Sequence, residues 1–79
     1  MHIDVVLPKI GMAMQDGTIV QWHKQVGDLV EKGEALFEVE TEKVSIDVES
    51  PDEGVLSEIL ANSGDTVDVG AVVARIEVE

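Results

Sequence analysis

Hydrophobic residues recur at every second position in several short runs of this chain, which is the period of a half-buried β-strand. The clearest run is 44–49, with Val or Ile at 44, 46 and 48 and polar residues between them. Runs rich in Val, Ile and Leu, bounded by Gly, Pro, Asp or Asn, predict strands over residues 3–7, 18–23, 34–40, 44–49, 55–60 and 71–78. No window carries a helical stripe. The pattern therefore predicts an all-β fold, either a flattened barrel or a sandwich of two small antiparallel sheets.

The same alternation predicts which side chains face the core. In 34–40, Ala35, Phe37 and Val39 are expected on one face, with Leu36 on the other face among glutamates. In 71–78, the expected core face is Val72, Ala74, Ile76 and Val78. Val39 and Val44 both fit the core pattern, so the residues between them should form a tight hairpin turn.

An internal repeat organises the chain. A shift of 37 residues superimposes the turn residues Gly17/Gly54, Gly27/Gly64, Asp28/Asp65 and Gly33/Gly70, together with Val30/Val67 and Glu40/Glu77. It also superimposes the apolar pairs Ile19/Leu56, Trp22/Ile59, Leu36/Val73 and Val39/Ile76. Two copies are too few for a solenoid. We expect two similar halves, related by a pseudo-twofold axis, that bury each other's apolar faces, with turns at the Gly-Asp pairs separating short connecting strands.

Composition limits the chain to one small domain, residues 1–79. It has no cysteine, which excludes disulfides and thiolate metal sites. Trp22 and Phe37 are the only aromatic residues, so the core must be aliphatic. The N-terminus lacks a charged region followed by an apolar stretch, and no apolar run is long enough to cross a bilayer. We expect a soluble, intracellular protein.

The charge is strongly acidic, with 17 Asp and Glu against five Lys and Arg and a formal net charge of −12. Nucleic acid and anionic membrane surfaces would repel such a protein, so neither is expected as a partner. The acids are either an ordinary solvated surface or a field that steers the protein toward a basic partner.

Lys43 lies at the hinge between the two copies, at or beside the tip of the expected hairpin. From Glu38 to Glu53 it is the one base among seven acids. A solvated lysine paired with a neighbouring glutamate is the ordinary interpretation, and such a pair contributes roughly 0–1 kcal/mol. The alternative is a functional lysine, presented on the single protruding turn of a symmetric scaffold.

The segment Glu40-Thr41-Glu42-Lys43-Val44 resembles the lipoylation motif of lipoyl domains, commonly Glu-Thr-Asp-Lys-Ala. Segments 7–12, 17–22 and 27–34 resemble the same family, and the resemblance covers residues 3–78. This sequence departs from the motif at Glu42 and Val44. Biotinyl domains share the fold, but their lysine lies between two methionines, so biotin is the weaker interpretation.

The resemblance implies a non-catalytic swinging-arm carrier with lipoate attached as an amide to Lys43. The arm would shuttle acyl groups and reducing equivalents in a 2-oxo acid dehydrogenase complex for pyruvate, 2-oxoglutarate, a branched-chain acid or acetoin. The implied partners are a lipoate ligase or lipoyl transferase, a thiamine-dependent decarboxylase, the acyltransferase catalytic domain and the flavoprotein dihydrolipoamide dehydrogenase. The isolated domain is expected to be a monomer. An unmodified binding module of the same fold stays open as an alternative.

The loop from Pro8 to Gly17 carries Ile10, Met12 and Met14. These side chains either cap the open end of the core or form a recognition surface near the lysine, as the resemblance implies for the decarboxylase. No other site is expected: His2 and His23 are interpreted as surface residues, the serines have no His-Asp constellation, and Asp52-Glu53 lacks calcium-loop spacing.

Overall fold

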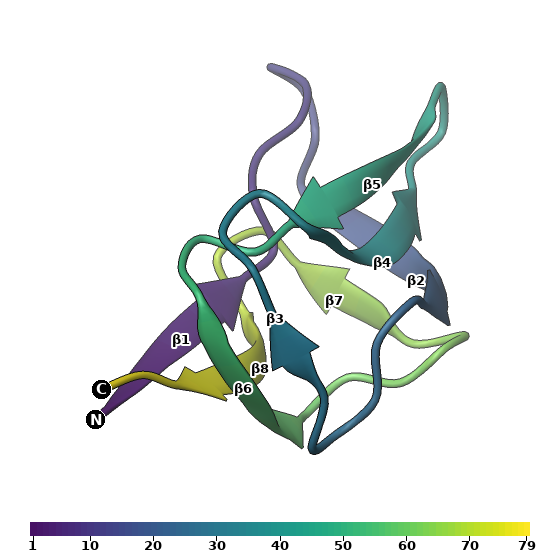
Figure 1. The fold of residues 1–79 in the computed structure, drawn as a ribbon. Helices are drawn as coiled ribbons and strands as arrows, with labels where there is room; N and C mark the ends of the chain where they lie inside the picture. Colours follow the sequence, from purple (N-terminus) through teal and green to yellow (C-terminus); the bar gives the residue numbers. More distant parts are fainter.

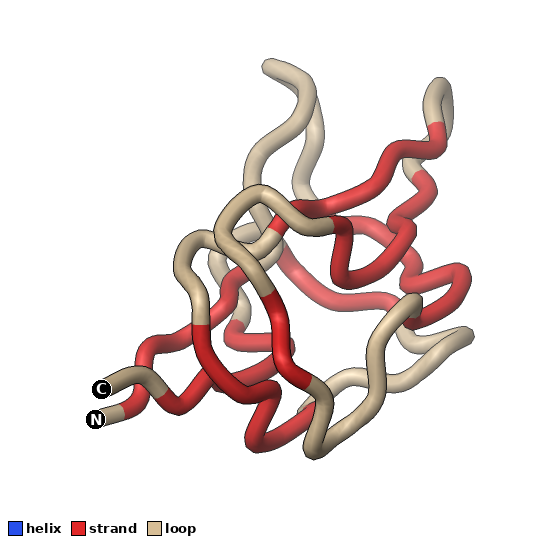
Figure 2. Tube along the Cα trace, viewed as in Figure 1, coloured by secondary structure: helices blue, strands red, loops and turns tan.

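The computed structural model describes all residues, 1–79, and contains strands and loops but no helix (Figure 2). The strands are β1 (His2–Val6), β2 (Asp16–Trp22), β3 (Leu29–Val30), β4 (Ala35–Glu40), β5 (Ser45–Glu49), β6 (Gly54–Ile59), β7 (Thr66–Asp68) and β8 (Val72–Glu77). They form two four-stranded antiparallel sheets, in the orders β1-β8-β6-β3 and β5-β4-β2-β7 (Figure 1). All six predicted strands are present within two residues of the predicted ends, and the all-β prediction is confirmed.

The two sheets are copies of one another, which confirms the internal repeat. The repeat matches β2 with β6, β3 with β7 and β4 with β8, and the two strands of each pair take equivalent places in opposite sheets. The remaining strands, β1 and β5, each lie at the edge of a sheet. The turn glycines match in pairs: Gly27 and Gly64 have φ angles of 99° and 94°, and Gly33 and Gly70 have 87° and 89°. Only glycine adopts such angles without steric cost, so the sequence repeat records a backbone requirement.

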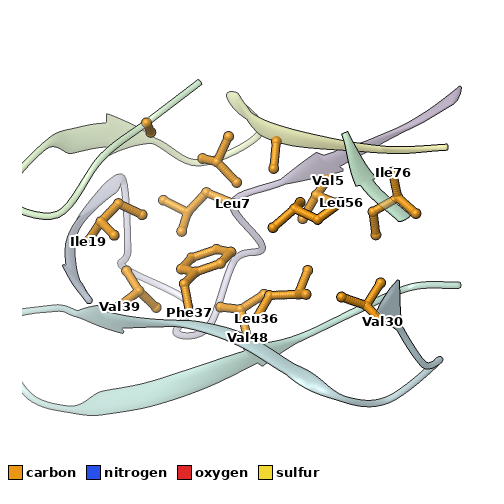
Figure 3. Packing of buried hydrophobic residues seen from close by; sticks show 13 residues of the cluster. Val5, Leu7, Ile19, Val30, Leu36, Phe37, Val39, Val48, Leu56 and Ile76 are labelled. Atoms are coloured by element: carbon orange, nitrogen blue, oxygen red, sulfur yellow. The ribbon is translucent and has the colours of Figure 1, made fainter. Parts of the chain in front are cut away.

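The core lies between the sheets and is almost entirely aliphatic. Thirteen buried hydrophobic residues form one cluster, and Phe37 is its largest side chain. Figure 3 shows Val5, Leu7 and Leu56 on one side and Leu36 and Val48 on the other, pointing into the same layer around the Phe37 ring. This mutual burial is what two sheets of this size need, because neither has a second layer of its own.

Two predictions of the core face are wrong, for one physical reason. Leu36 and Val73 were expected away from the core, yet both have no exposed surface. Each is the extra residue of a β-bulge: β4 gains Leu36 between the pairs Ala35↔Glu49 and Phe37↔Val48, and β8 gains Val73 between Ala74↔Val5 and Val72↔Val6. A bulge interrupts the two-residue alternation, so two consecutive side chains face the core.

The two ends of the molecule differ. The chain termini lie side by side at one end, where the Val78 amide donates to the Met1 carbonyl oxygen at 2.8 Å. The β4–β5 turn and the loop after β1 project at the opposite end (Figure 1). A chain extended from either terminus would leave the β4–β5 turn free, because the termini lie at the opposite end of the molecule.

No helix in the structure is suited to crossing a membrane.

Candidate functional site

The β4–β5 turn, residues 41–44, presents Lys43 to solvent. The flanking strands are paired up to Glu40↔Ser45, so the four turn residues extend beyond the last pair of the ladder. Lys43 is exposed, and its Nζ makes no hydrogen bond or ion pair despite the nearby glutamates. The predicted hairpin is confirmed, whereas the prediction that Val44 belongs to the core is wrong: its exposed fraction is 46%.

A threonine hydroxyl, which the sequence reasoning did not single out, organises this turn. Thr41 Oγ1 accepts hydrogen bonds from the backbone amides of Lys43 and Val44, each at 3.3 Å. The same hydroxyl donates a hydrogen bond to the Val44 carbonyl oxygen at 3.3 Å. The Thr41 amide donates to that oxygen as well, at 2.8 Å. A threonine two residues before an exposed turn lysine was the available signal, because Thr side chains commonly bond to nearby backbone groups in turns.

The lysine turn and the loop after β1 enclose a hollow. Its volume is about 570 Å³, and it is lined by residues 10–16 on one side and 41–44 on the other. The loop is therefore beside Lys43, as the resemblance implied. The loop and the turn both project at the end of the molecule that is distant from the termini (Figure 2).

Three apolar residues of the loop after β1, Ile10, Met12 and Met14, divide between two roles: capping the core and forming an exposed surface near the lysine. Met12 is 97% exposed and stabilises nothing in the core. Ile10 and Met14 are partly buried against the core, and the Ile10 amide donates to Met14 Sδ at 3.2 Å. Met14 caps the core and positions the loop, while Met12 is available for contact with another molecule.

The other basic residues are less suited to carry a group. Lys24 Nζ is 2.8 Å from Glu34 Oε2, and this hydrogen bond raises the pKa of Lys24 and lowers that of Glu34. Arg75 bridges Asp4 and Glu58 at 3.2 and 3.1 Å, and the hydrogen bond to Asp4 chiefly raises its pKa. Lys9 and Lys32 are exposed and have no ion-pair partner, but neither lies on the projecting hairpin between β4 and β5.

The histidine and serine side chains of the structure do not form a catalytic arrangement with one another. His23 Nε2 lies 2.8 Å from Asp47 Oδ1 on the outer face of the sheet, a pair that the sequence reasoning missed because its members are 24 residues apart. The serine hydroxyls of Ser45, Ser50 and Ser57 bond to Glu38, Asp52 and Arg75 rather than to a histidine. The structure groups no three His, Asp or Glu side chains as metal ligands.

Comparison with known proteins agrees with this geometry. The model of the biotin/lipoyl family, described as "Biotin-requiring enzyme", matches residues 3–76. The solution structure of the lipoyl domain of the 2-oxoglutarate dehydrogenase complex from Azotobacter vinelandii has a TM-score of 0.78 and 36% identity, over 96% of each chain. The chain belongs to this family and is a lipoyl domain.

Curated relatives of this lipoyl domain are acyltransferase components of 2-oxo acid dehydrogenase complexes. It is 55% identical over 73 residues to the dihydrolipoyllysine-residue acetyltransferase component of the pyruvate dehydrogenase complex of Corynebacterium glutamicum. It is 52% identical over 73 residues to the dihydrolipoyllysine-residue succinyltransferase component of the 2-oxoglutarate dehydrogenase complex of Staphylococcus saprophyticus. Each alignment covers 92% of the chain but only 11% and 17% of the respective relative. The lipoyl domain thus spans less than a fifth of the length of these relatives.

Proposed function

We propose that the lipoyl domain carries lipoate as an amide on Lys43 and acts as the non-catalytic swinging arm of a 2-oxo acid dehydrogenase complex. The observation that carries the proposal is the exposed, unpaired lysine at the tip of the β4–β5 hairpin, opposite the chain termini. Bound lipoate supplies a dithiolane that accepts an acyl group together with electrons, while the protein supplies position.

The residues around Lys43 fit such a group. The lysine Nζ has no partner to lose on acylation, and the hollow beside it has apolar and polar walls open to solvent. The molecule measures 36 × 19 × 19 Å. The termini lie at the end opposite the β4–β5 turn (Figure 1), so a tether there leaves the arm unobstructed. A tethered carrier meets successive active sites at an effective concentration on the order of millimolar.

The proposed partners follow from this role. They are a lipoate ligase or lipoyl transferase, a thiamine-dependent decarboxylase, an acyltransferase catalytic domain and the flavoprotein dihydrolipoamide dehydrogenase. The relatives' names support complexes acting on pyruvate or 2-oxoglutarate. We propose that the exposed Met12, beside the lysine turn, belongs to the surface that the decarboxylase recognises, because a flexible thioether adapts to a partner. The compartment proposed is the cytoplasm, or the mitochondrial matrix in a eukaryote.

Enzymatic lipoylation tests the proposal. Incubated with lipoate, ATP and a lipoate ligase, the protein should gain one lipoyl amide, and peptide mass spectrometry should place it on Lys43. Loss of one positive charge changes the formal net charge from −12 to −13, so the product should migrate faster on a native gel. The Lys43→Arg variant keeps the charge and should stay unmodified. Modification of Lys9, Lys24 or Lys32 in its place would refute the assignment.

Two alternatives make different predictions in related assays. A biotin carrier would be modified efficiently by a biotin ligase, whereas we expect poor biotinylation because Glu42 and Val44 flank the lysine. An unmodified binding module would carry a free Lys43 in protein purified from its native host. Mass spectrometry of the native protein distinguishes this from a carrier.

A further inference from the structure

We propose that Thr41 is the positioning residue that fixes Lys43 for modification, because its hydroxyl accepts the hydrogen bonds of two turn amides, those of Lys43 and Val44, that bond to no backbone carbonyl. This inference rests on the proposed function, since it concerns how the lysine is presented to the modifying enzyme. It assigns to Thr41 a role distinct from that of the charged residues next to the lysine.

Four other turns of four residues close in a different way. Turns 25–28, 31–34, 62–65 and 68–71 each place a glycine with positive φ third and close with a bond from the fourth amide to the first carbonyl oxygen, at 3.0 Å in all four. Glycine with positive φ at this position is the signature of a type II turn. In three of these turns, 25–28, 31–34 and 62–65, the first amide also donates to the carboxylate of the fourth residue. In all four, however, the fourth amide has a backbone acceptor.

The lysine turn, 41–44, has neither feature. It contains no glycine and no residue with positive φ, and the Val44 amide makes no bond to the Thr41 carbonyl oxygen. Instead, the amides of Val44 and Lys43 both donate to Thr41 Oγ1 at 3.3 Å. The backbone closes this turn only in the opposite sense, with the Thr41 amide donating to the Val44 carbonyl oxygen at 2.8 Å. The hydroxyl therefore takes the place of the backbone acceptor that binds the fourth amide in the glycine turns.

Removal of this hydroxyl should release the turn without unfolding the domain. The two amides lie in an exposed segment, so water can replace the lost acceptor and little folding free energy changes. The turn then samples several conformations, and only a fraction of the molecules presents Lys43 in the geometry that the enzyme binds. The apparent affinity falls by that fraction.

The experiment compares three variants of the protein as lipoylation substrates. Thr41→Val removes the hydroxyl and keeps the β-branched shape, while Thr41→Ser keeps the hydroxyl. Thr66→Val is the matched control, because Thr66 is an exposed strand threonine whose hydroxyl bonds to Thr18 Oγ1 at 2.9 Å, away from the turn. For each protein the KM and kcat of a lipoate ligase are measured, together with urea unfolding and amide hydrogen exchange at Lys43 and Val44.

For Thr41→Val we expect KM to rise about tenfold at unchanged kcat, which corresponds to about 1.4 kcal/mol. Exchange of the Lys43 and Val44 amides should accelerate, while Thr41→Ser and Thr66→Val should behave like the parent. A lower kcat at unchanged KM, parallel to lower stability, would show that Thr41 is merely structural and would overturn the inference. Equal KM values for parent and Thr41→Val would overturn it too, while leaving the carrier function intact. No lipoylation of the parent at Lys43 would reject both.

Discussion

Leu36 and Val73 occupy the same place in the two halves of the lipoyl domain: each is the extra residue of a β-bulge, and each is fully buried. The bulges turn two neighbouring side chains inward at each site, namely Leu36 with Phe37 and Val73 with Ala74. In a domain with few aromatic residues, each bulge adds a second apolar side chain to the core at that point of the strand. The symmetric bulges are thus part of how a short chain fills its core.

Truncation at the bulges should be as costly as at any core position. We expect Leu36→Ala to lower the free energy of unfolding by about 2–5 kcal/mol through lost burial and a residual cavity. Val73→Ala removes fewer atoms and should lower it by about 2 kcal/mol. Val20→Ala is the control, because Val20 is a bulge residue that is 42% exposed, and it should change stability by less than about 1 kcal/mol. Urea unfolding measures all three, and an equal effect at Val20 and Leu36 would contradict the role given to burial.

The strand glycines make a second, geometric prediction. A Cβ on Gly54 would collide with the Glu77 carbonyl oxygen and lie 2.9 Å from Ile76 Cγ2, so backbone must move. A Cβ on Gly17 would meet Val39 Cγ2 at 2.7 Å and Met14 Cε at 3.2 Å, which are side-chain atoms. We expect Gly54→Ala to destabilise by about 3 kcal/mol or more and Gly17→Ala by about 1–2 kcal/mol.

Gly11→Ala provides the matched control for these glycines. A Cβ there meets nothing within 4 Å, and its backbone angle is not in the left-handed region. Its melting temperature should stay near that of the parent. If Gly54→Ala melts like Gly11→Ala, the close approach of β6 and β8 is not as the structure has it.

The loop methionines should separate recognition from stability. Met12→Ser removes a side chain that is 97% exposed, so the melting temperature should not change, whereas reductive acylation by the cognate decarboxylase should slow. Met14→Ser removes a thioether packed on the core, so the melting temperature should fall. Lipoylation by the ligase should be little affected by Met12→Ser. Unchanged reductive acylation of Met12→Ser would remove that residue from the proposed recognition surface.

The position of the lysine on its turn can be tested without changing composition or charge. Exchanging the two neighbours, Glu42→Lys with Lys43→Glu, keeps the net charge of −12 and alters two exposed residues. The free energy of unfolding should change by no more than about 0.5 kcal/mol. Lipoylation should nevertheless fall sharply, because the lysine stem then points elsewhere and its amide no longer bonds to Thr41 Oγ1. Equal lipoylation of both proteins, measured beside urea unfolding, would show that the enzyme reads acidic surroundings rather than turn geometry.

The sequence by itself determined the strands, the turns and the place of the lysine. Alternation along 44–49 predicts a strand because side chains on extended backbone point to opposite faces, a purely local relation. The 37-residue repeat predicts two equal halves because Gly27 and Gly64, or Gly33 and Gly70, meet the same backbone requirement twice. Lys43 could be placed on a hairpin because the strands before and after it are adjacent in the chain.

Only the tertiary structure decided in which strands the alternation of buried and exposed side chains is interrupted, and which side chains from distant segments contact each other. The burial of Leu36 and Val73 depends on bulges, which arise from the pairing of β4 with β5 and of β8 with β1 and interrupt the two-residue pattern. The pairing of His23 with Asp47 and the split between Met12 and Met14 likewise depend on segments brought together by the sheets. The role of Thr41 depends on hydrogen-bond geometry within the turn, because the sequence alone does not say whether the Val44 amide bonds to the Thr41 hydroxyl or to the Thr41 carbonyl oxygen.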